Sequence, residues 1–216
     1  MARLDRTYCD ICNKPLPSMG YYKLKDGCMC ASCSKIISPL LKNRRDKTTE
    51  YIRRHIEYRE ENKKKICRFR ASIAFGYDKK IYIDPYMSAF VVTKRKEEDI
   101  CLDNPDIIML SQVVSCDTDI KEYTKEEYNQ NEEGEKESYY PPHLRHFYDF
   151  KTEIVLNNEW FDKIVVDLNG ESVEGKGSIR YQKCSSIAKQ IKDTLLYDRK
   201  KSVLGVKRED SHLFRL

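Results

Sequence analysis

Four cysteines in two C-x2-C pairs constrain the fold of this chain more than any other feature of its sequence. Cys9 and Cys12 form the first pair and Cys30 and Cys33 the second, with 17 residues between the pairs. Four thiolates can close a tetrahedron around one Zn²⁺ at zinc–sulfur distances of about 2.3 Å. Such a site has no open position for water or substrate. We therefore predict one structural Zn²⁺ on which the folding of this small unit depends.

A fifth cysteine, Cys28, leaves an alternative open. It lies two residues before Cys30, so the ligands could instead be Cys9, Cys12, Cys28 and either Cys33 or Cys30. Two residues spaced in this way on a strand are less suited to a ligand pair at a helix terminus. The sequence therefore favours the two C-x2-C pairs, with the Cys28 thiol packed in a hairpin.

The residues around the ligands predict a treble-clef finger over residues 1–45. Asn13 follows the first pair, where a knuckle turn often needs a residue that tolerates positive φ. Residues 14–29, with the dipeptide Asp26-Gly27, predict a loop and a short hairpin. The second pair then begins a helical run, so that the first turn of this helix carries the last two ligands.

Residues 46–66 predict one long, mostly exposed helix that links the finger to the rest of the chain. The segment from 46 to 65 contains no Gly or Pro, and Asp46 or Thr48 is suited to the N-cap. Its apolar or aromatic stripe is narrow, so we expect it to lie against one surface. The stripe consists of Tyr51, Ile52, His55, Ile56 and the aliphatic stem of Arg59.

Residues 67–200 predict a β-rich domain with a helix at its end. The hydrophobic period changes to two after Lys65, and about six or seven short strands are expected. An amphipathic helix over 183–198 follows, with Cys184, Ile187, Ala188, Ile191 and Leu195 on one face. The fold class is thus α+β, with an antiparallel β-sandwich or partly open barrel capped by a C-terminal helix.

The strands are expected at 67–77, 81–85, 88–94, 107–118, 148–156, 161–169 and 177–182. The polar, acidic segment at about 123–143 predicts a flexible insertion in a hairpin. Residues 201–216 form a short basic tail without an assigned structure.

Several stretches resemble a family of small bacterial and phage proteins of unknown function. They are CDICNKPL, YYKLKDGCMCASC, YIRRHIEYREENKKK and FRASIAFGYDKKIYIDPYMSAFVV. In that family a zinc ribbon or treble clef is joined by a helical linker to a domain similar to a bacterial pleckstrin-homology domain. The resemblance covers residues 8–122 and 145–198. It implies a pleckstrin-homology-like β domain and four ligand cysteines, and it implies no activity.

Other features of the sequence concern where the protein resides. The longest apolar runs, AFVV and IIML, are far shorter than the roughly 18 residues of a membrane span. The N-terminus MARLDRTY lacks the apolar core of a secretory signal. We therefore expect a soluble protein of a reducing compartment, the cytoplasm, or the host cytoplasm if a phage encodes it, without disulfides.

Charge is distributed unevenly along the chain. Residues 1–68 carry 17 Lys and Arg against 8 Asp and Glu, a net +9, whereas residues 69–216 carry a net −4. A basic front can attract nucleic acid. Nucleic-acid binding through the finger and helix is therefore the alternative function, and a net −4 disfavours lipid headgroups as the ligand of the β domain. The candidate contacts are Lys42, Arg44, Arg45, Lys47, Arg53, Arg54, Lys63, Lys64 and Lys65.

No set of residues forms a convincing catalytic constellation. Residues 170–178 nearly match a P-loop, but Gly177 stands where Ser or Thr belongs and a strand is expected to follow. His143 and His146 have no fixed metal-binding partner nearby. Cys67, Cys101, Cys116 and Cys184 are expected to be small buried residues. The leading hypothesis is a non-enzymatic adaptor that binds a protein partner through its β domain and linker helix.

Overall fold

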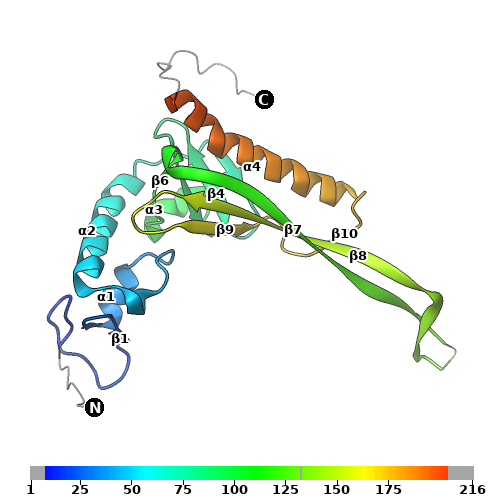
Figure 1. The fold of residues 1–216 in the computed structure, drawn as a ribbon, viewed down its shortest axis with the longest axis horizontal. Helices are drawn as coiled ribbons and strands as arrows, with labels where there is room; N and C mark the ends of the chain where they lie inside the picture. The colour runs from blue at the N-terminus through cyan, green and yellow to red at the C-terminus, as the bar shows by residue number, and fades with distance from the viewer. Residues whose placement is uncertain (1–7, 132, 204–216) are drawn as a thin grey trace.

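The chain forms an arch with three parts (Figure 1). The structure is a computed structural model that describes residues 8–131 and 133–203. A cysteine-rich finger lies at one end of the arch. A body of two antiparallel sheets and a long helix lies in the middle, and a two-stranded ribbon extends from the body at the other end.

The finger consists of very short elements. Strand β1 (Tyr22–Lys23) pairs antiparallel with β2 (Cys28–Met29), and helix α1 (Ala31–Ile36) follows. A 3-10 turn, η1 (Arg44–Asp46), leads out of the finger. Because so small a unit buries few apolar side chains, it needs additional support such as a metal. Its buried cluster contains Cys9, Leu24, Met29, Cys30, Cys33, Ile37, Leu41 and Ile52.

Helix α2 (Thr49–Ile66) connects the finger to the body, as the sequence predicts. Thr48 is its N-cap, and the Thr48 hydroxyl accepts a hydrogen bond of 3.2 Å from the backbone N–H of Tyr51. Ile52 packs into the finger cluster, and Ile66 packs into a second cluster beneath the first sheet of the body. The buried stripe thus contacts both the finger and the body, and α2 is called the spine helix below.

A buried polar network also joins the finger, α2 and the body. The Arg59 guanidinium lies 2.7 Å from the Asp106 carboxylate, and both side chains are almost fully buried. The Ser38 hydroxyl donates a 2.5 Å hydrogen bond to the same carboxylate. The backbone N–H of Ser38 donates to Nε2 of the buried His55 at 3.2 Å. Ser38 belongs to the finger, Arg59 to α2 and Asp106 to the body. The network therefore fixes the orientation of these three parts relative to one another.

The first sheet of the body is an antiparallel meander in the order β3-β4-β5-β6. Its strands are β3 (Ile73–Phe75), β4 (Lys80–Asp84), β5 (Ala89–Thr93) and β6 (Ile108–Met109). Two short helices, η2 (Glu97–Asp99) and α3 (Ile100–Asp103), lie between β5 and β6, and η3 (Leu110–Gln112) follows β6.

The first predicted strand, residues 67–77, is mostly wrong, since only residues 73–75 are extended in the sheet. Cys67 caps the end of α2. The backbone N–H of Arg70 donates to the Asp84 carboxylate at 2.7 Å and not to a neighbouring strand.

The second sheet packs on the first across the main core. It contains β7 (Val113–Gln130), β8 (Lys136–Leu156), β9 (Lys163–Asp167) and β10 (Val173–Glu174), with β7, β9 and β10 all paired to β8. The core side chains come from both sheets and from the last helix. The largest fully buried ones include Phe90, Phe150, Ile154, Ile191 and Leu195.

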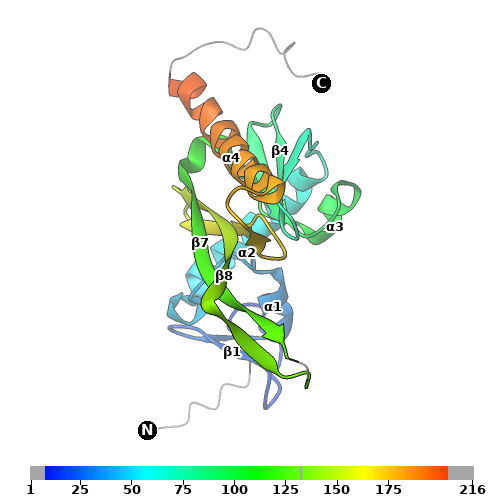
Figure 2. The same cartoon turned by 90° about the vertical axis from the view of Figure 1, so that its right-hand side faces the viewer.

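Helix α4 (Ile179–Val203) lies along the body in both views (Figures 1 and 2). The predicted face is confirmed, because Cys184, Ile191 and Leu195 are buried in the core. The predicted strand at 177–182 is wrong. The helix begins there instead, and the Ser178 hydroxyl accepts a 3.2 Å hydrogen bond from the backbone N–H of Tyr181. No helix in the described part of the chain is both long and apolar enough to cross a membrane.

The acidic segment at 123–143 is a correction to the sequence analysis. It does not form an irregular insertion; it lengthens β7 and β8 into a ribbon that leaves the body (Figures 1 and 2). Pairing runs from Tyr123 opposite Phe147 to Gln130 opposite Lys136, and a register shift leaves residues 139–142 as a bulge. The sequence misleads here because the ribbon has no core to bury, so neither face carries the apolar alternation of a half-buried strand.

The predicted tail, residues 201–216, lies partly outside the described residues. Helix α4 continues to Val203, and the remaining residues of the tail are not described.

Candidate metal centre

The first two ligand candidates lie in a tight turn before the hairpin. The backbone N–H of Cys9 donates to the carbonyl of Lys14 at 2.8 Å, and the N–H of Asn13 donates to the carbonyl of Cys9 at 2.8 Å. Asn13 has a φ of 55°, as the knuckle prediction requires. This turn brings the thiols of Cys9 and Cys12 to the same side of the backbone, toward the second pair.

The second two ligand candidates lie at the start of α1. Cys30 is the N-cap of this helix, and its sulfur accepts a hydrogen bond of 3.4 Å from the backbone N–H of Cys33. The β1–β2 hairpin ends directly before Cys30 and delivers it beside Cys9, whose sulfur accepts from the Cys30 N–H at 3.2 Å. Turn, hairpin and helix therefore follow in the expected order.

The four sulfur atoms lie within 4.8 Å of one another. Cys9 Sγ is 3.9 Å from Cys33 Sγ, and Cys12 Sγ is 3.7 Å from Cys30 Sγ. Sulfurs at the corners of a tetrahedron with metal–sulfur bonds of about 2.3 Å are separated by about 3.8 Å. The side chains already have the spacing that a tetrahedral metal ion needs.

The environment of the sulfurs favours thiolates that share a cation. The backbone N–H of Cys33 holds the pKa of the Cys30 thiol down to about 7. Burial raises the pKa of the Cys33 thiol far above its ordinary value. A buried cluster of thiols cannot ionise fully alone, because the negative charges would repel one another. A divalent cation bound by all four removes that obstacle.

The chemistry of such a centre is structural. Four protein sulfurs fill a tetrahedral coordination sphere, so a bound ion would hold the turn, the hairpin and α1 together without offering a position to substrate. Among the described residues, no second group of three or more His, Cys, Asp or Glu lies close enough to hold an ion.

Cys28 lies outside the four-sulfur group. Its thiol is buried and donates to the Asp10 carboxylate at 3.3 Å, and its backbone N–H donates to the same carboxylate at 2.7 Å. The position agrees with the predicted thiol packed in the hairpin.

The remaining cysteines divide into two groups. Cys116 and Cys184 are buried, as expected, and burial raises the pKa of the Cys116 thiol to about 11. The prediction of burial is wrong for Cys67 and Cys101, which are exposed. Cys67 caps α2 and Cys101 lies in α3, so neither belongs to a strand of the core.

The histidine pair and the P-loop-like stretch at 170–178 form parts of the ribbon and its base. His143 stacks on Tyr139 at 4.3 Å between ring centroids, and His146 contacts Glu122 at 2.8 Å. The stretch 170–178 forms β10 and the turn before α4, where Gly175 has a φ of 72°. Strand β10 therefore lies inside the P-loop-like stretch, and α4 follows it where the sequence analysis expected a strand.

The predicted basic residues do not form one surface. Several are engaged within the protein: Arg54 pairs with Glu159, Lys65 with Glu61, and Arg53 with the carbonyl of Asp10. Lys63 and Lys64 lie at the far end of α2, remote along the helix from the finger. The nine residues are therefore divided between a group beside the finger and a group spread along α2.

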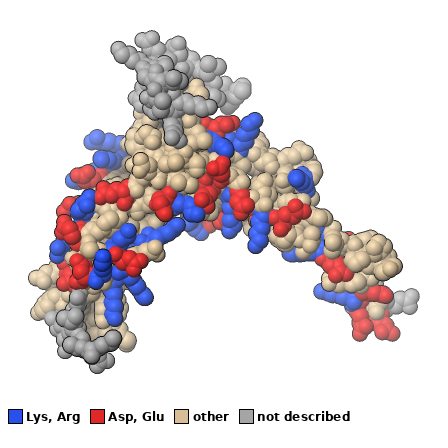
Figure 3. All heavy atoms as spheres, in the orientation of Figure 1, with Lys and Arg blue, Asp and Glu red and all other residues tan. Residues whose placement is uncertain are grey.

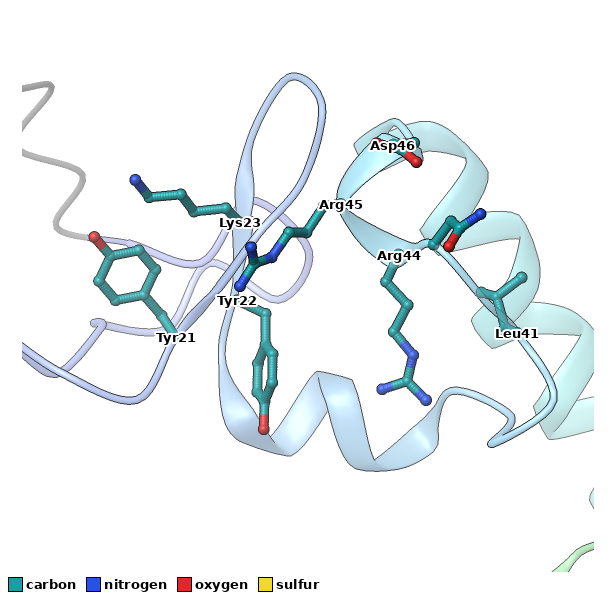
Figure 4. Close-up of a pocket in the computed structure, with 8 residues that line it drawn as sticks. Tyr21, Tyr22, Lys23, Leu41, Arg44, Arg45 and Asp46 are labelled. Carbon is teal, nitrogen blue, oxygen red and sulfur yellow. The ribbon is translucent and has the colours of Figure 1, made fainter.

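A hollow beside the finger collects part of this charge together with residues that the sequence analysis missed (Figure 4). Tyr21, Tyr22 and Lys23 come from the hairpin and face the segment 41–46, which supplies two of the predicted arginines. No sequence pattern joins these segments, because their proximity follows from the folding of the finger. The lining residues are Tyr21, Tyr22, Lys23, Leu41, Asn43, Arg44, Arg45 and Asp46.

Comparison with known proteins relates only the finger to a described family. A family described as a domain of unknown function (DUF4428) matches residues 7–55, which include the four cysteines and the first turns of α2. No curated protein and no solved structure matches the chain significantly. The matched segment thus covers the cysteine centre and the start of α2.

Proposed function

We propose that the protein is a non-enzymatic zinc-binding adaptor that binds a protein partner through its β domain. The finger is a treble clef, and its ion is Zn²⁺, because four thiolates at tetrahedral spacing suit this ion best. The site needs reduced thiols, so the protein works in a reducing compartment such as the cytoplasm. A family without assigned activity matches the finger and is consistent with a structural role for it.

We propose that the body is a pleckstrin-homology-like domain. A four-stranded antiparallel meander is followed by a second antiparallel sheet and then by one C-terminal helix that packs on the core. This order of elements supports the proposed fold. Domains of this kind present strand edges and loops to partners.

The ribbon is the observation that carries the proposal. The carbonyl of His146 still accepts from the backbone N–H of Gly175 at 2.9 Å, but farther out, within the described residues, β7 and β8 pair only with each other. An isolated two-stranded ribbon is marginally stable in water. Yet this one exposes large apolar side chains: Tyr128 and Leu144 are 49% and 55% exposed, and Tyr140 is fully exposed. Such a ribbon gains stability when a partner covers it.

The charge of the ribbon indicates the chemistry of the partner. Residues 122–146 contain seven Glu and three Lys or Arg, a net −4. Acidic side chains gather at its far end (Figure 3). A partner with a basic face would be attracted to it, and one with an extended segment could add a strand to either outer edge. The ribbon therefore selects a basic protein partner.

We propose that α2 contributes less to binding than the β domain does. Its apolar stripe is used inside the arch, where Ile52, His55 and Ile66 are buried. The outer face carries both acidic and basic residues, many of them paired. We therefore assign the partner surface to the ribbon and not to α2.

Affinity capture with two matched double variants tests the proposal. Tyr140→Ser with Leu144→Ser removes two exposed apolar side chains from the ribbon. Tyr86→Ser with Leu102→Ser removes the same residue types from the body, where they are 77% and 73% exposed. We expect the ribbon variant to lose a protein that wild type and the body variant both retain, as measured by cross-linking and mass spectrometry. Equal retention by both variants, or turnover of a substrate by the purified protein, contradicts the proposal.

A further inference from the structure

The hollow beside the finger, defined by the eight residues that line it, combines basic and aromatic side chains. Two segments far apart in sequence meet there, because the backbone N–H of Lys25 donates to the carbonyl of Lys47 at 2.9 Å. Three of the lining residues are cations and one, Asp46, is acidic. Two others are tyrosines from β1 and the residue before it.

The three cations of the hollow differ in whether other groups of the protein bind them. Arg44 is held in place by the protein, since its guanidinium donates to the Ser34 hydroxyl at 3.2 Å and to the Ser38 carbonyl at 3.1 Å. Lys23 and Arg45 are exposed and form no ion pair with any residue that the structure describes. Figure 4 shows the Arg45 guanidinium above Tyr22 and near the base of the Lys23 side chain, whose ammonium points away from it. Two separate cations that no described acidic side chain pairs with can each bind a phosphate of the same strand.

The tyrosines give the hollow a second kind of binding surface. Tyr21 and Tyr22 are 39% and 47% exposed, so part of each ring faces water. Aromatic rings beside cations that track a backbone are the combination with which proteins bind single-stranded nucleic acid. An acidic peptide would satisfy the cations, but its carboxylates have no flat face to stack on a ring.

We propose that this hollow binds single-stranded nucleic acid, with phosphates on Lys23 and Arg45 and an unpaired base stacked on Tyr22. Lys42 and Lys47, on the same connecting segment, extend the positive charge beyond the hollow and draw the strand toward it. Lys63, Lys64 and Lys65 take no part. This interaction is independent of the ribbon, and the adaptor would then join a protein and a nucleic acid.

Binding of a labelled oligothymidylate of about 12 nucleotides to the full chain tests the inference. Fluorescence anisotropy is recorded between about 50 and 200 mM salt. Lys23→Gln with Arg45→Gln should lower the slope of log affinity against log salt by about 1.4, since each lost phosphate contact of a single strand contributes about 0.7. Lys63→Gln with Lys64→Gln removes the same charge from α2 and should leave the slope unchanged.

Stacking is tested separately at Tyr22. Tyr22→Ala should weaken binding about 5- to 150-fold, whereas Tyr22→Phe keeps the ring and should bind like wild type. Metal content equal to that of wild type verifies that each variant is folded.

Four results would overturn the inference. They are no binding of the oligonucleotide by wild type, an unchanged affinity of Tyr22→Ala, an equal loss of slope in the α2 variant, and tighter binding of polyglutamate than of the oligonucleotide. The last result would assign the hollow to an acidic protein segment.

Discussion

The finger and the ribbon lie at opposite ends of the arch and are stabilised in different ways. The finger has almost no regular structure, and its four sulfurs converge on one point. The ribbon has long regular strands but buries almost nothing along residues 123–143. Convergence of four cysteine side chains therefore characterises one region, and backbone pairing characterises the other. In this molecule, a region with long regular strands is therefore not for that reason more stable by itself than a region with little regular structure.

Loss of a ligand should have the largest effect. Cys30→Ser removes one of four sulfurs, and structural zinc sites contribute about 10–16 kcal/mol of apparent binding free energy to folding. We expect loss of the metal and unfolding of residues 8–43, with the body still folded. Metal analysis and hydrogen exchange measure both results. Cys28→Ser is the control and should keep about one Zn²⁺ per chain; loss of metal from that variant would instead make Cys28 a ligand.

The buried pair that joins α2 to the body should have the next largest effect. Arg59→Ala leaves the Asp106 carboxylate buried without its cation, which costs about 3–5 kcal/mol of unfolding free energy. Urea unfolding measures the loss. Lys64→Ala, an exposed cation on the same helix, should change stability by less than about 0.5 kcal/mol. A similar small effect for Arg59→Ala would mean that the finger and body are not coupled through this network.

The pH dependence of stability should follow from His55. Burial lowers the pKa of His55 to about 4, whereas an unfolded histidine titrates near 6.5. The unfolded chain then binds more protons between these values, so stability falls as pH decreases from about 6.5 to 4. The total loss is about 3 kcal/mol.

The single tryptophan, Trp160, can report this loss, because its ring lies 4.9 Å from that of His55. Urea unfolding of wild type is compared at each pH with His55→Gln, which lacks the titrating group. His143→Gln removes a histidine of the ribbon as the control and should keep the wild-type slope. If His55→Gln also keeps that slope, another group is responsible.

Shortening the ribbon should have the smallest effect on stability. Replacing residues 126–144 by Asn-Gly keeps Lys125 opposite Arg145 and closes the strands with a favoured two-residue turn. Because the removed side chains contact little, the unfolding free energy should change by less than about 1 kcal/mol, while partner capture is lost. Denaturant unfolding and the capture experiment measure the two results. A loss of several kcal/mol would show that the ribbon supports the body.

Some features could be predicted from the sequence because they depend on neighbours in the chain. The spacing of Cys9, Cys12, Cys30 and Cys33 predicts their convergence, and Asn13 predicts the turn between them. Helix α2 and the buried face of α4 follow from the 3.6-residue period. In each case the local backbone determines which side chains share a face or a turn.

Other features could not be predicted from the sequence because no local pattern encodes them. The ribbon is polar on both faces, so the absence of apolar alternation suggested an irregular insertion. Residues 177–182 alternate as a strand would, but Tyr181 packs on Tyr148 and Phe150 at 4.9 and 5.0 Å and belongs to the first turns of α4. Packing against residues distant in sequence overrode the local preference.

The sequence by itself determined the candidate ligand set, the spine helix and the α+β class, since ligand spacing and hydrophobic period act over a few residues. Only the tertiary structure decided the surfaces on which the proposed functions rest. It brought Tyr22 and Lys23 beside Arg45, buried Arg59 against Asp106, and extended β7 and β8 away from the body. These arrangements depend on contacts between segments separated by 20 or more residues, and such contacts form only when the whole chain folds.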